Sequence, residues 1–393
     1  MMIVIADDFT GSAELAGISW QYGFDTAVRT NVDLRQSCDV LILDSDIRSR
    51  RLQEIEKILP QLTVKLAKFD FDTLYIKIDS VLRGHILREL EILMEELGYS
   101  GALMVPANPS VNRIIKNGHY FIDGIPLNET DFAYDPEYPR LHSDIPSLLG
   151  ATVSHHLNVL KADQKLSEQG IQIGDCHSVS DLEHWAAQLT PGLLPVGASD
   201  FFEQIIKMKP SIGRQNLSQK EFQHQFPLLG LVGSISGQSA ENLKIFTHMG
   251  IPVCYPPSHK DKIRSSEPVF LENWVDQIVK TLENNQIAIV ATNNLVTTRY
   301  RDQPRSIIMM LSNLIKRVYR RVYVRELVIE GGATASAVIR KLGWEHLKPR
   351  FEFDRGIVAL SRADDPDTSL VVKPGSYLWP DAFYDGLVPS SPN

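Results

Sequence analysis

Cysteine is scarce in this chain, and the three cysteines that occur are isolated. Cys38, Cys176 and Cys254 lie far apart, and none belongs to a C-x-x-C pair. A structural zinc site needs closely spaced cysteines or histidines, and a disulfide framework normally shows an even number of cysteines. We therefore expect free thiols and a reducing compartment.

Long apolar runs and an excess of positive charge are also missing. No stretch approaches the roughly 20 apolar residues that span a bilayer, and no basic segment precedes an apolar one near Met1. The formal net charge of −8 provides no basic field to attract the phosphates of a nucleic acid. We expect a cytoplasmic protein without a membrane or nucleic-acid partner.

Two common nucleotide-binding fingerprints are absent as well. The chain contains neither a G-x-x-x-x-G-K-[ST] loop nor a G-x-G-x-x-G turn. This argues against a P-loop NTPase and against a nicotinamide dehydrogenase with the usual dinucleotide fold. A nucleotide would have to be bound by another kind of turn.

What the 393 residues do contain is an alternation of short apolar strands and amphipathic helices. Such alternation predicts parallel strands joined by right-handed crossovers. We expect an α/β protein with two domains, each a mainly parallel sheet flanked by helices, and a cleft between them. A polar, weakly periodic segment separates the two halves, which gives a first domain, a linker and a second domain at residues 1–206, 207–226 and 227–393.

The alternation is interrupted after the fourth strand. Residues 118–127 have the pattern of a hairpin, with Asp123-Gly124 as its turn signal. The proline-punctuated stretch 131–139 is longer than a plain connection requires, and loops of that length are often functional.

Two acids end the first strand. Asp7 and Asp8 directly follow an apolar run, and the carboxyl ends of parallel strands form the ligand-binding edge of an open α/β sheet. Taken alone, the pair fits a helix cap as well as a catalytic pair. Thr10 and Ser12 are good N-cap residues for a helix expected to begin near Ala13, which leaves the acids available for chemistry.

The third strand ends in the most informative polar group. Lys77 lies within the strand pattern, where a charge must be paired or directed at a ligand. The segment continues with Asp79, Ser80, Arg83 and Gly84. An arginine at a helix entrance can bind a carboxylate through two hydrogen bonds. The structural alternative is an ion pair of Lys77 with Asp79, or of Arg83 with Asp46.

Two turns in the second half have the composition of phosphate-binding turns. Gly233-Ser234-Ile235-Ser236 and Gly331-Gly332-Ala333-Thr334 each follow an apolar strand and open a helix. Glycine permits close backbone approach, and exposed N–H groups with the helix dipole favour an anion. One such turn often reflects backbone geometry alone. Two turns in one domain, together with Lys373-Pro374-Gly375, favour a shared phosphate site.

In combination, these motifs resemble the four-carbon acid sugar kinase family, earlier catalogued as a domain of unknown function. They occur in the family's order, as Asp7 to Gly11, Lys77 to Gly84, Gly233 to Ser236, Gly331 to Thr334 and Lys373 to Gly375. The resemblance implies an N-terminal domain that binds an anionic sugar acid and a C-terminal domain that binds ATP. It also implies a Mg²⁺-assisted kinase acting on the terminal hydroxyl of threonate, erythronate or 3-oxo-tetronate type acids.

The resemblance further assigns roles to the residues. Asp8 and Arg83 are the expected catalytic residues: Asp8 orients the reacting hydroxyl and accepts its proton, while Arg83 with Lys77 holds the substrate carboxylate. The rest of the expected substrate pocket is Asp7, Asp79, Ser80 and Gly84. The expected nucleotide contacts are Ser234, Ser236, Gly331, Gly332, Ala333, Thr334 and Gly375. No side chain is assigned to a metal.

Three departures from the family pattern leave alternatives open. Ala333 stands where an acid usually follows the glycine pair, Ser376-Tyr377-Leu378 replaces Gly-aromatic-Gly, and Gly197-Ala198-Ser199-Asp200 lacks a glycine-rich continuation. A kinase of another small hydroxy acid, or a non-catalytic ATP or metabolite sensor, remains an alternative. The acid sugar and its stereoisomer stay open. A homodimer is an expectation drawn from the exposed sheet edges of such proteins.

Overall fold

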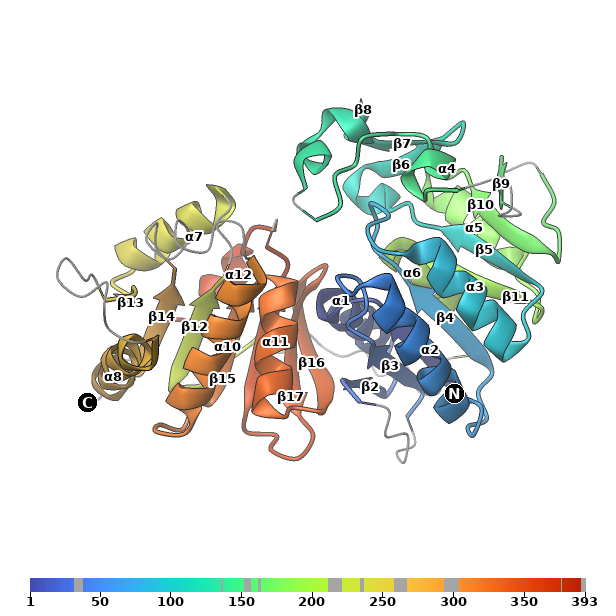
Figure 1. Ribbon diagram of the computed structural model, residues 1–393. Helices are drawn as coiled ribbons and strands as arrows, with labels where there is room; N and C mark the ends of the chain where they lie inside the picture. Colours follow the sequence, from blue (N-terminus) through green and yellow to red (C-terminus); the bar gives the residue numbers. More distant parts are fainter. Residues whose placement is uncertain are drawn as a thin grey trace. The chain divides into compact units, whose positions relative to one another are not determined.

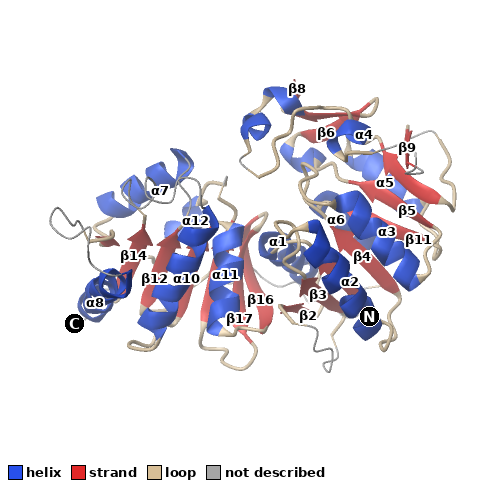
Figure 2. Ribbon diagram, viewed as in Figure 1, coloured by secondary structure: helices blue, strands red, loops and turns tan. Residues whose placement is uncertain are grey.

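A computed structural model describes the chain over residues 1–31, 38–135, 137–151, 157–161, 164–210, 221–233, 237–257, 267–292, 304–375 and 377–389. The chain divides into two compact units, Met1–Asn216 and Leu217–Asn393. Half of the predicted linker, residues 211–220, lies outside the described residues. The α/β class is confirmed, since mostly parallel strands are flanked by helices (Figure 2).

The first unit contains a parallel array of strands. Its described strands run in the order β2-β3-β1-β4-β11-β5-β10-β9, and the neighbouring pairs are parallel (Figure 1). The bounds are β1 (Met2–Ala6), β2 (Thr26–Arg29), β3 (Val40–Asp44), β4 (Thr73–Lys77), β5 (Gly101–Val105), β9 (Leu157–Leu160), β10 (Gly170–Gly174) and β11 (Leu193–Gly197). β1, β3 and β5 are buried throughout, as their unbroken apolar sequences predict.

Helices cover the strands of this unit. α2 packs against α3, and α6 packs against both α1 and α5. The bounds are α1 (Phe9–Gln21), α2 (Leu52–Leu66), α3 (Ile86–Leu97), α4 (Ile145–Leu148), α5 (Val179–Ala187) and α6 (Ser199–Lys207). α3 ends at Gly98, which has the left-handed conformation that glycine favours at a helix C-cap. β2 and α6 were not predicted from the sequence.

The predicted hairpin is confirmed as part of a small antiparallel sheet. It consists of β6 (Arg113–Lys116), β7 (His119–Ile122) and β8 (Ile125–Pro126). Asp123 and Gly124 both have positive φ, at 50° and 80°, as a tight hairpin turn requires. Three short 3-10 helices flank this sheet: η1 (Pro109–Val111), η2 (Leu127–Glu129) and η3 (Asp131–Tyr134).

The second unit has a mixed arrangement. Its described strands run in the order β13-β14-β12-β15-β18-β17-β16, parallel as far as β18 and antiparallel beyond it. The bounds are β12 (Leu228–Val232), β13 (Val253–Cys254), β14 (Ile287–Ala291), β15 (Glu326–Glu330), β16 (His346–Asp354), β17 (Ile357–Arg362) and β18 (Ser369–Lys373). The long strand β16 was not predicted from the sequence.

Helices pack on these strands as well. α10 packs against both α8 and α11. The bounds are α7 (Gly237–His248), α8 (Glu267–Asn285), α10 (Pro304–Tyr319), α11 (Gly332–Leu342) and α12 (Asp381–Tyr384). None of the helices in the described ranges has both the length and the apolar composition needed to cross a membrane.

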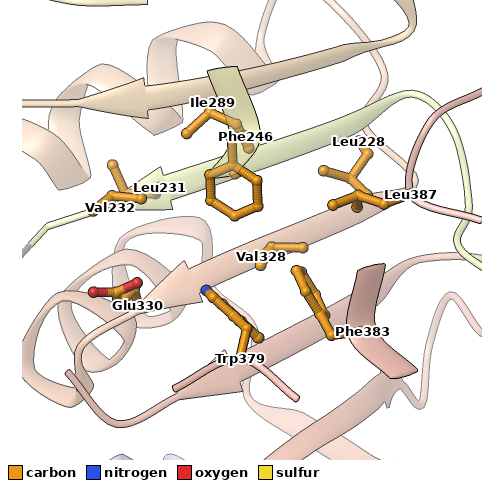
Figure 3. A pocket seen from close by; sticks show the side chains of 11 residues that line it. Leu228, Leu231, Val232, Phe246, Ile289, Val328, Glu330, Trp379, Phe383 and Leu387 are labelled. Atoms are coloured by element: carbon orange, nitrogen blue, oxygen red, sulfur yellow. The ribbon is translucent and has the colours of Figure 1, made fainter. Parts of the chain in front are cut away.

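An apolar pocket lies in the core of the second unit. Phe246 of α7, Phe383 of α12 and Trp379 approach the strand residue Val328 there (Figure 3). Its free volume is only about 10 Å³, near the minimum that a single water molecule needs. This pocket is therefore a gap in the packing of the core. The polar residues at the strand ends are better candidates for a functional site.

Candidate functional site

The register of the first unit aligns the carboxyl ends of its central strands. Ala6 of β1 pairs with Asp44 of β3 on one side and with Lys77 of β4 on the other. Gly197 of β11 also pairs with Lys77. The polar residues that follow these strands therefore meet at one edge, the position predicted for Asp7, Asp8 and the segment from Lys77 to Gly84. We call this place the acidic edge.

Asp8 caps helix α1, which begins at Phe9. The Asp8 Oδ1 atom accepts a 2.8 Å hydrogen bond from the Gly11 N–H, and Oδ2 accepts a 2.6 Å bond from the Thr10 hydroxyl. The prediction that Thr10 and Ser12 cap a helix starting near Ala13 is wrong. Asp8 has the extended backbone conformation of an N-cap residue, so its own carboxylate is placed to accept the Gly11 N–H of the first helical turn.

Arg48 links the two acids that follow β1. Its Nε and Nη2 atoms donate to the two carboxylate oxygens of Asp7 at 2.7 and 2.8 Å, and Nη1 donates to Asp8 Oδ2 at 2.6 Å. Nη1 also lies 3.7 Å from Asp79 Oδ1. Arg48 was not among the predicted site residues. The available signal was an arginine just beyond the polar end of the apolar run that forms β3.

The two neighbouring acids differ in proton affinity. Burial raises the pKa of Asp7, and the charge of Arg48 only partly opposes this shift. Burial also acts to raise the pKa of Asp8, but Arg48, Lys77 and the hydrogen bonds from Thr10 and Gly11 outweigh it and lower the pKa. Environments that separate two carboxyl groups in this way are typical of sites with distinct acid and base roles. Of the two carboxylates, Asp8 therefore has the lower proton affinity.

Asp79 and Arg83 form a bidentate ion pair. Arg83 Nε and Nη2 donate to Asp79 at 2.9 and 2.8 Å, and Nη1 donates to Asp135 Oδ2 at 3.1 Å. Burial would raise the pKa of Asp79, but the charges of Arg83 and Arg48 lower it well below its usual range. The alternative pairing of Arg83 with Asp46 is wrong, because these partners differ and Asp46 bonds to Arg50 instead.

Lys77 lies beneath the start of helix α1. Its Nζ atom donates to the carbonyl of Ile78 at 3.0 Å and lies 3.9 Å from Glu14 Oε2. The predicted alternative, an ion pair between Lys77 and Asp79, is therefore wrong. Gly11 makes this approach possible, because a Cβ atom there would lie 3.3 Å from Lys77 Nζ. The buried ammonium adds positive charge close to Asp8.

The remaining predicted residues of this half border the same edge. Ser80 accepts a 2.6 Å hydrogen bond from Arg113 Nη1, and Gly84 has a φ of +106°, a conformation that favours glycine. Glu89, on the first turn of α3, was missed. It is 3% exposed, its Oε1 atom has no hydrogen-bond partner among the described residues, and burial raises its pKa to about 8.

The second unit aligns its predicted turns at another strand edge. Val232 of β12 pairs with Glu330 of β15, which pairs in turn with Lys373 of β18. The turns that follow these strands therefore begin side by side. A Cβ atom at Gly233 would lie only 2.5 Å from Thr334 Oγ1, so the absence of a side chain lets the first two turns touch. Ser234 and Ser236 lie outside the described residues.

The glycine pair Gly331-Gly332 begins helix α11. Gly331 is the N-cap with a φ of +104°, and its N–H donates to the Lys373 carbonyl at 2.9 Å. Gly332, Ala333 and Thr334 form the first helical turn, whose N–H groups and positive dipole end can receive an anion. Gly375 lies two residues beyond the end of β18. We call this place the glycine edge.

The two edges offer different chemistry. The acidic edge combines fixed carboxylates with buried cations, which suits a small hydroxylated anion. The glycine edge presents backbone donors at a helix start, which suits phosphate. Across the described ranges, no group of three or more His, Cys, Asp or Glu side chains is placed to hold a metal ion.

Both halves of the chain match profiles of known protein families. A profile described as a sugar-binding N-terminal domain matches residues 2–203, and one described as a nucleotide-binding C-terminal domain matches residues 229–377. These profiles define a class of protein with one sugar-binding and one nucleotide-binding domain. The chain belongs to the four-carbon acid sugar kinase family.

Characterised relatives carry names from this family. A D-threonate kinase of Salmonella typhimurium is 32% identical over 38% of this chain and 36% of its own length. A D-erythronate kinase of Heliobacterium modesticaldum is 25% identical over 62% of this chain and 59% of its own. These matches span about a third to three fifths of each relative. A 3-oxo-tetronate kinase of Haemophilus influenzae is 21% identical over 98% of both chains.

Solved structures share the fold. A crystal structure of a Salmonella typhimurium protein superposes with a TM-score of 0.78 at 20% identity, covering 98% of both chains. A Haemophilus influenzae protein from a family of unknown function superposes with a TM-score of 0.71 at 19% identity, covering 97% of this chain and 98% of its own.

Proposed function

We propose that this protein is an ATP-dependent kinase that phosphorylates the terminal hydroxyl of a four-carbon sugar acid. The candidate substrates are of the threonate, erythronate or 3-oxo-tetronate type, the acids that name its relatives. The observation that carries the proposal is the bridge from Arg48 to Asp7 and Asp8 at the acidic edge, in the half that matches the sugar-binding domain.

In this proposal Asp8 receives the proton of the reacting hydroxyl. Its lowered pKa keeps the carboxylate ionised, and hydrogen bonds from Thr10 and Gly11 fix its orientation. A positioned base of this kind supplies roughly 10²- to 10⁴-fold of rate. Asp7 orients Asp8 indirectly, because both carboxylates bond to the same guanidinium of Arg48.

Cations at the same edge hold the substrate carboxylate. Arg83 and Lys77 are the proposed ligands, with Asp79, Ser80 and Gly84 shaping the pocket around them. Asp79 accepts two hydrogen bonds from the Arg83 side chain, which fixes the guanidinium plane. Arg48 places a further positive charge beside Asp8 at this edge.

At the glycine edge, backbone N–H groups bind the phosphates of ATP. Gly331, Gly332, Ala333 and Thr334 at the start of α11, together with Gly375, are the described part of the proposed nucleotide site. Ser234 and Ser236 are proposed to complete it. Phosphoryl transfer depends mainly on positioning and charge neutralisation, which backbone donors and a helix dipole can supply.

The reaction also requires the two substrates to meet. We propose residues 1–206 as the acid-sugar domain, 207–226 as the linker and 227–393 as the nucleotide domain. Mg²⁺ enters as the ion that ATP carries, where it neutralises phosphate charge. A homodimer remains part of the proposal, to be checked by the molecular mass in solution.

The test is an ATP-consumption assay over a panel of three-, four- and five-carbon hydroxy acids. Turnover that is fastest with a four-carbon acid supports the proposal. Preference for a shorter or longer acid would indicate a kinase of another hydroxy acid. ATP binding without turnover on any acid would contradict the kinase proposal and favour a sensor.

A further inference from the structure

Lys373 is a fully buried lysine at the glycine edge. It ends strand β18, its exposed fraction is 0%, and its ammonium lies 5.3 Å from the centre of the Trp379 ring. The Nζ atom donates to the carbonyls of Pro374 and Tyr377 at 3.1 and 2.5 Å. Its third neighbour is Glu330 Oε2, at 3.4 Å. An ammonium has three donors, so these acceptors inside the second unit account for all of them.

Glu330 connects this lysine to helix α7. It ends strand β15, is 1% exposed, and accepts hydrogen bonds from the Ser239 hydroxyl and, at 2.9 Å, from Asn242 Nδ2. Both donors belong to α7, the helix that follows β12. One carboxylate thus joins the starts of α7 and α11 to the loop after β18.

Neither charge is stable alone at this depth. Burial lowers the pKa of Lys373, and the opposite charge of Glu330 counters that shift. Removing one partner from a buried ion pair leaves the other uncompensated, which is more costly than the pair itself. The two residues therefore depend on each other, and the segments they hold depend on both.

The position of the acid also differs from the pattern that the family resemblance leads one to expect. The family resemblance leads one to expect an acid after the glycine pair, where Ala333 stands, and Glu330 lies just before the pair instead. Its carboxylate bonds to Ser239, Asn242 and Lys373, and so is directed into the protein.

We infer that Glu330 and Lys373 are positioning residues of the nucleotide site, which hold helix α7, the turn after β15 and the loop after β18 in one arrangement. The inference rests on the proposed nucleotide function of this edge. Lys373 acts on the phosphates through the backbone of its loop, because its own donors are directed to Pro374, Tyr377 and Glu330.

The chain provides a matched control at the other end of the same strand. Glu326 begins β15, is 0% exposed, and bonds to His224 Nδ1, the Gln225 N–H and the Ser369 hydroxyl. Glu326 and Glu330 are thus buried, hydrogen-bonded glutamates on one strand, and only Glu330 is at the glycine edge. If Glu330 had only a structural role, replacing it would change stability and ATP affinity in the same way as replacing Glu326.

The experiment compares Glu330→Gln with Glu326→Gln in the full chain. Calorimetric titration with ATP and Mg²⁺ gives the affinity for ATP, and thermal unfolding gives the stability of each variant. Each titration is run at a temperature below the unfolding midpoint of that variant. We expect both variants to unfold earlier, and Glu330→Gln to bind ATP roughly tenfold or more weakly than Glu326→Gln, because it alone disturbs the turns. Lys373→Met is the second variant, with the same expected loss.

The outcomes separate this inference from the proposed function. Equal ATP affinity in the two glutamine variants, or wild-type affinity in both Glu330→Gln and Lys373→Met, would overturn the inference while leaving the nucleotide site in place. A wild-type protein that binds no ATP would overturn the proposed function together with the inference.

Discussion

Arg48 and Asp7 form a two-pronged ion pair at the end of β1, with N–O distances of 2.7 and 2.8 Å, and the same guanidinium reaches Asp8 at 2.6 Å. This geometry needs the planar fork of arginine, since a lysine ammonium offers a single point of charge. Arg48 therefore sets the relative placement of the two carboxylates, although it lies 40 residues from Asp8 in the chain.

Arg48→Lys is expected to lower kcat/KM for the acid sugar by roughly a hundredfold, the effect of a small misplacement in a catalytic site. Steady-state kinetics with the best acid of the panel measures this. Arg50→Lys is the matched control: it pairs with Asp46, is 39% exposed at its side chain, and is expected to change activity little. Equal effects from both variants would contradict the role of Arg48.

Asp8→Asn separates the charge of this residue from its capping role. Asparagine caps helices about as well as aspartate, so the cap should be kept, and any fall in the unfolding midpoint should come from the lost charge pairing with Arg48. The rate should fall by roughly 10²- to 10⁴-fold, because the amide cannot accept the proton. Asp8→Ala should lose both the rate and, through the missing cap, about 1 kcal/mol of stability. Retention of full activity in Asp8→Asn would exclude Asp8 as the base.

Gly233→Ala tests the contact between the glycine turns. The added Cβ would lie 2.5 Å from Thr334 Oγ1 and 3.0 Å from Thr334 Cγ2, which forces the two turns apart. ATP affinity should fall, and the double variant Gly233→Ala/Thr334→Ala should recover part of it because the clashing atoms are gone. Calorimetry measures both. An unchanged affinity in the single variant would show that the turns do not act together on ATP.

Glu89 makes the stability of the protein depend on pH. Its pKa is raised from 4.5 to about 8 in the folded state, so folding favours the neutral form. The stabilising contribution of this group is complete below about pH 4.5 and is lost as pH rises towards 8. Glu89→Gln removes this dependence, so its advantage over the wild type should grow between pH 5 and 8 by up to about 1.4 kcal/mol per pH unit.

Unfolding free energies at several pH values test this expectation for Glu89. Glu95→Gln, an exposed position on the same helix, is the control and should follow the wild type at each pH. A constant difference between Glu89→Gln and the wild type across this range would show that Glu89 is already ionised in the folded protein.

Local sequence patterns predicted the strand ends well. The apolar runs before Asp7, Lys77 and Gly331 were sufficient to locate these strand ends. A buried strand consists of consecutive apolar residues, and polar residues begin at its carboxyl end. The pairing of β1 with both β3 and β4 then places Asp7 near Lys77 without further information.

Long-range side-chain partners could not be predicted in the same way. Arg48 is one of several arginines after β3, and only the folded conformation of that loop shows that it is the partner of Asp7 and Asp8. The burial of Glu89 depends on surrounding elements rather than on its own position in α3. The helix cap was assigned to the wrong residue because Asp8, Thr10 and Ser12 are all good caps, and backbone conformation decides among them.

The most direct test of the account is mass spectrometry of the products after incubation with ATP, Mg²⁺ and each four-carbon acid, alongside Asp8→Asn. We predict that one or more of threonate, erythronate and 3-oxo-tetronate gains a single phosphate in a one-to-one ratio with ADP, and that Asp8→Asn forms almost none. ATP binding with no phosphorylated acid from any member of the panel would contradict the account.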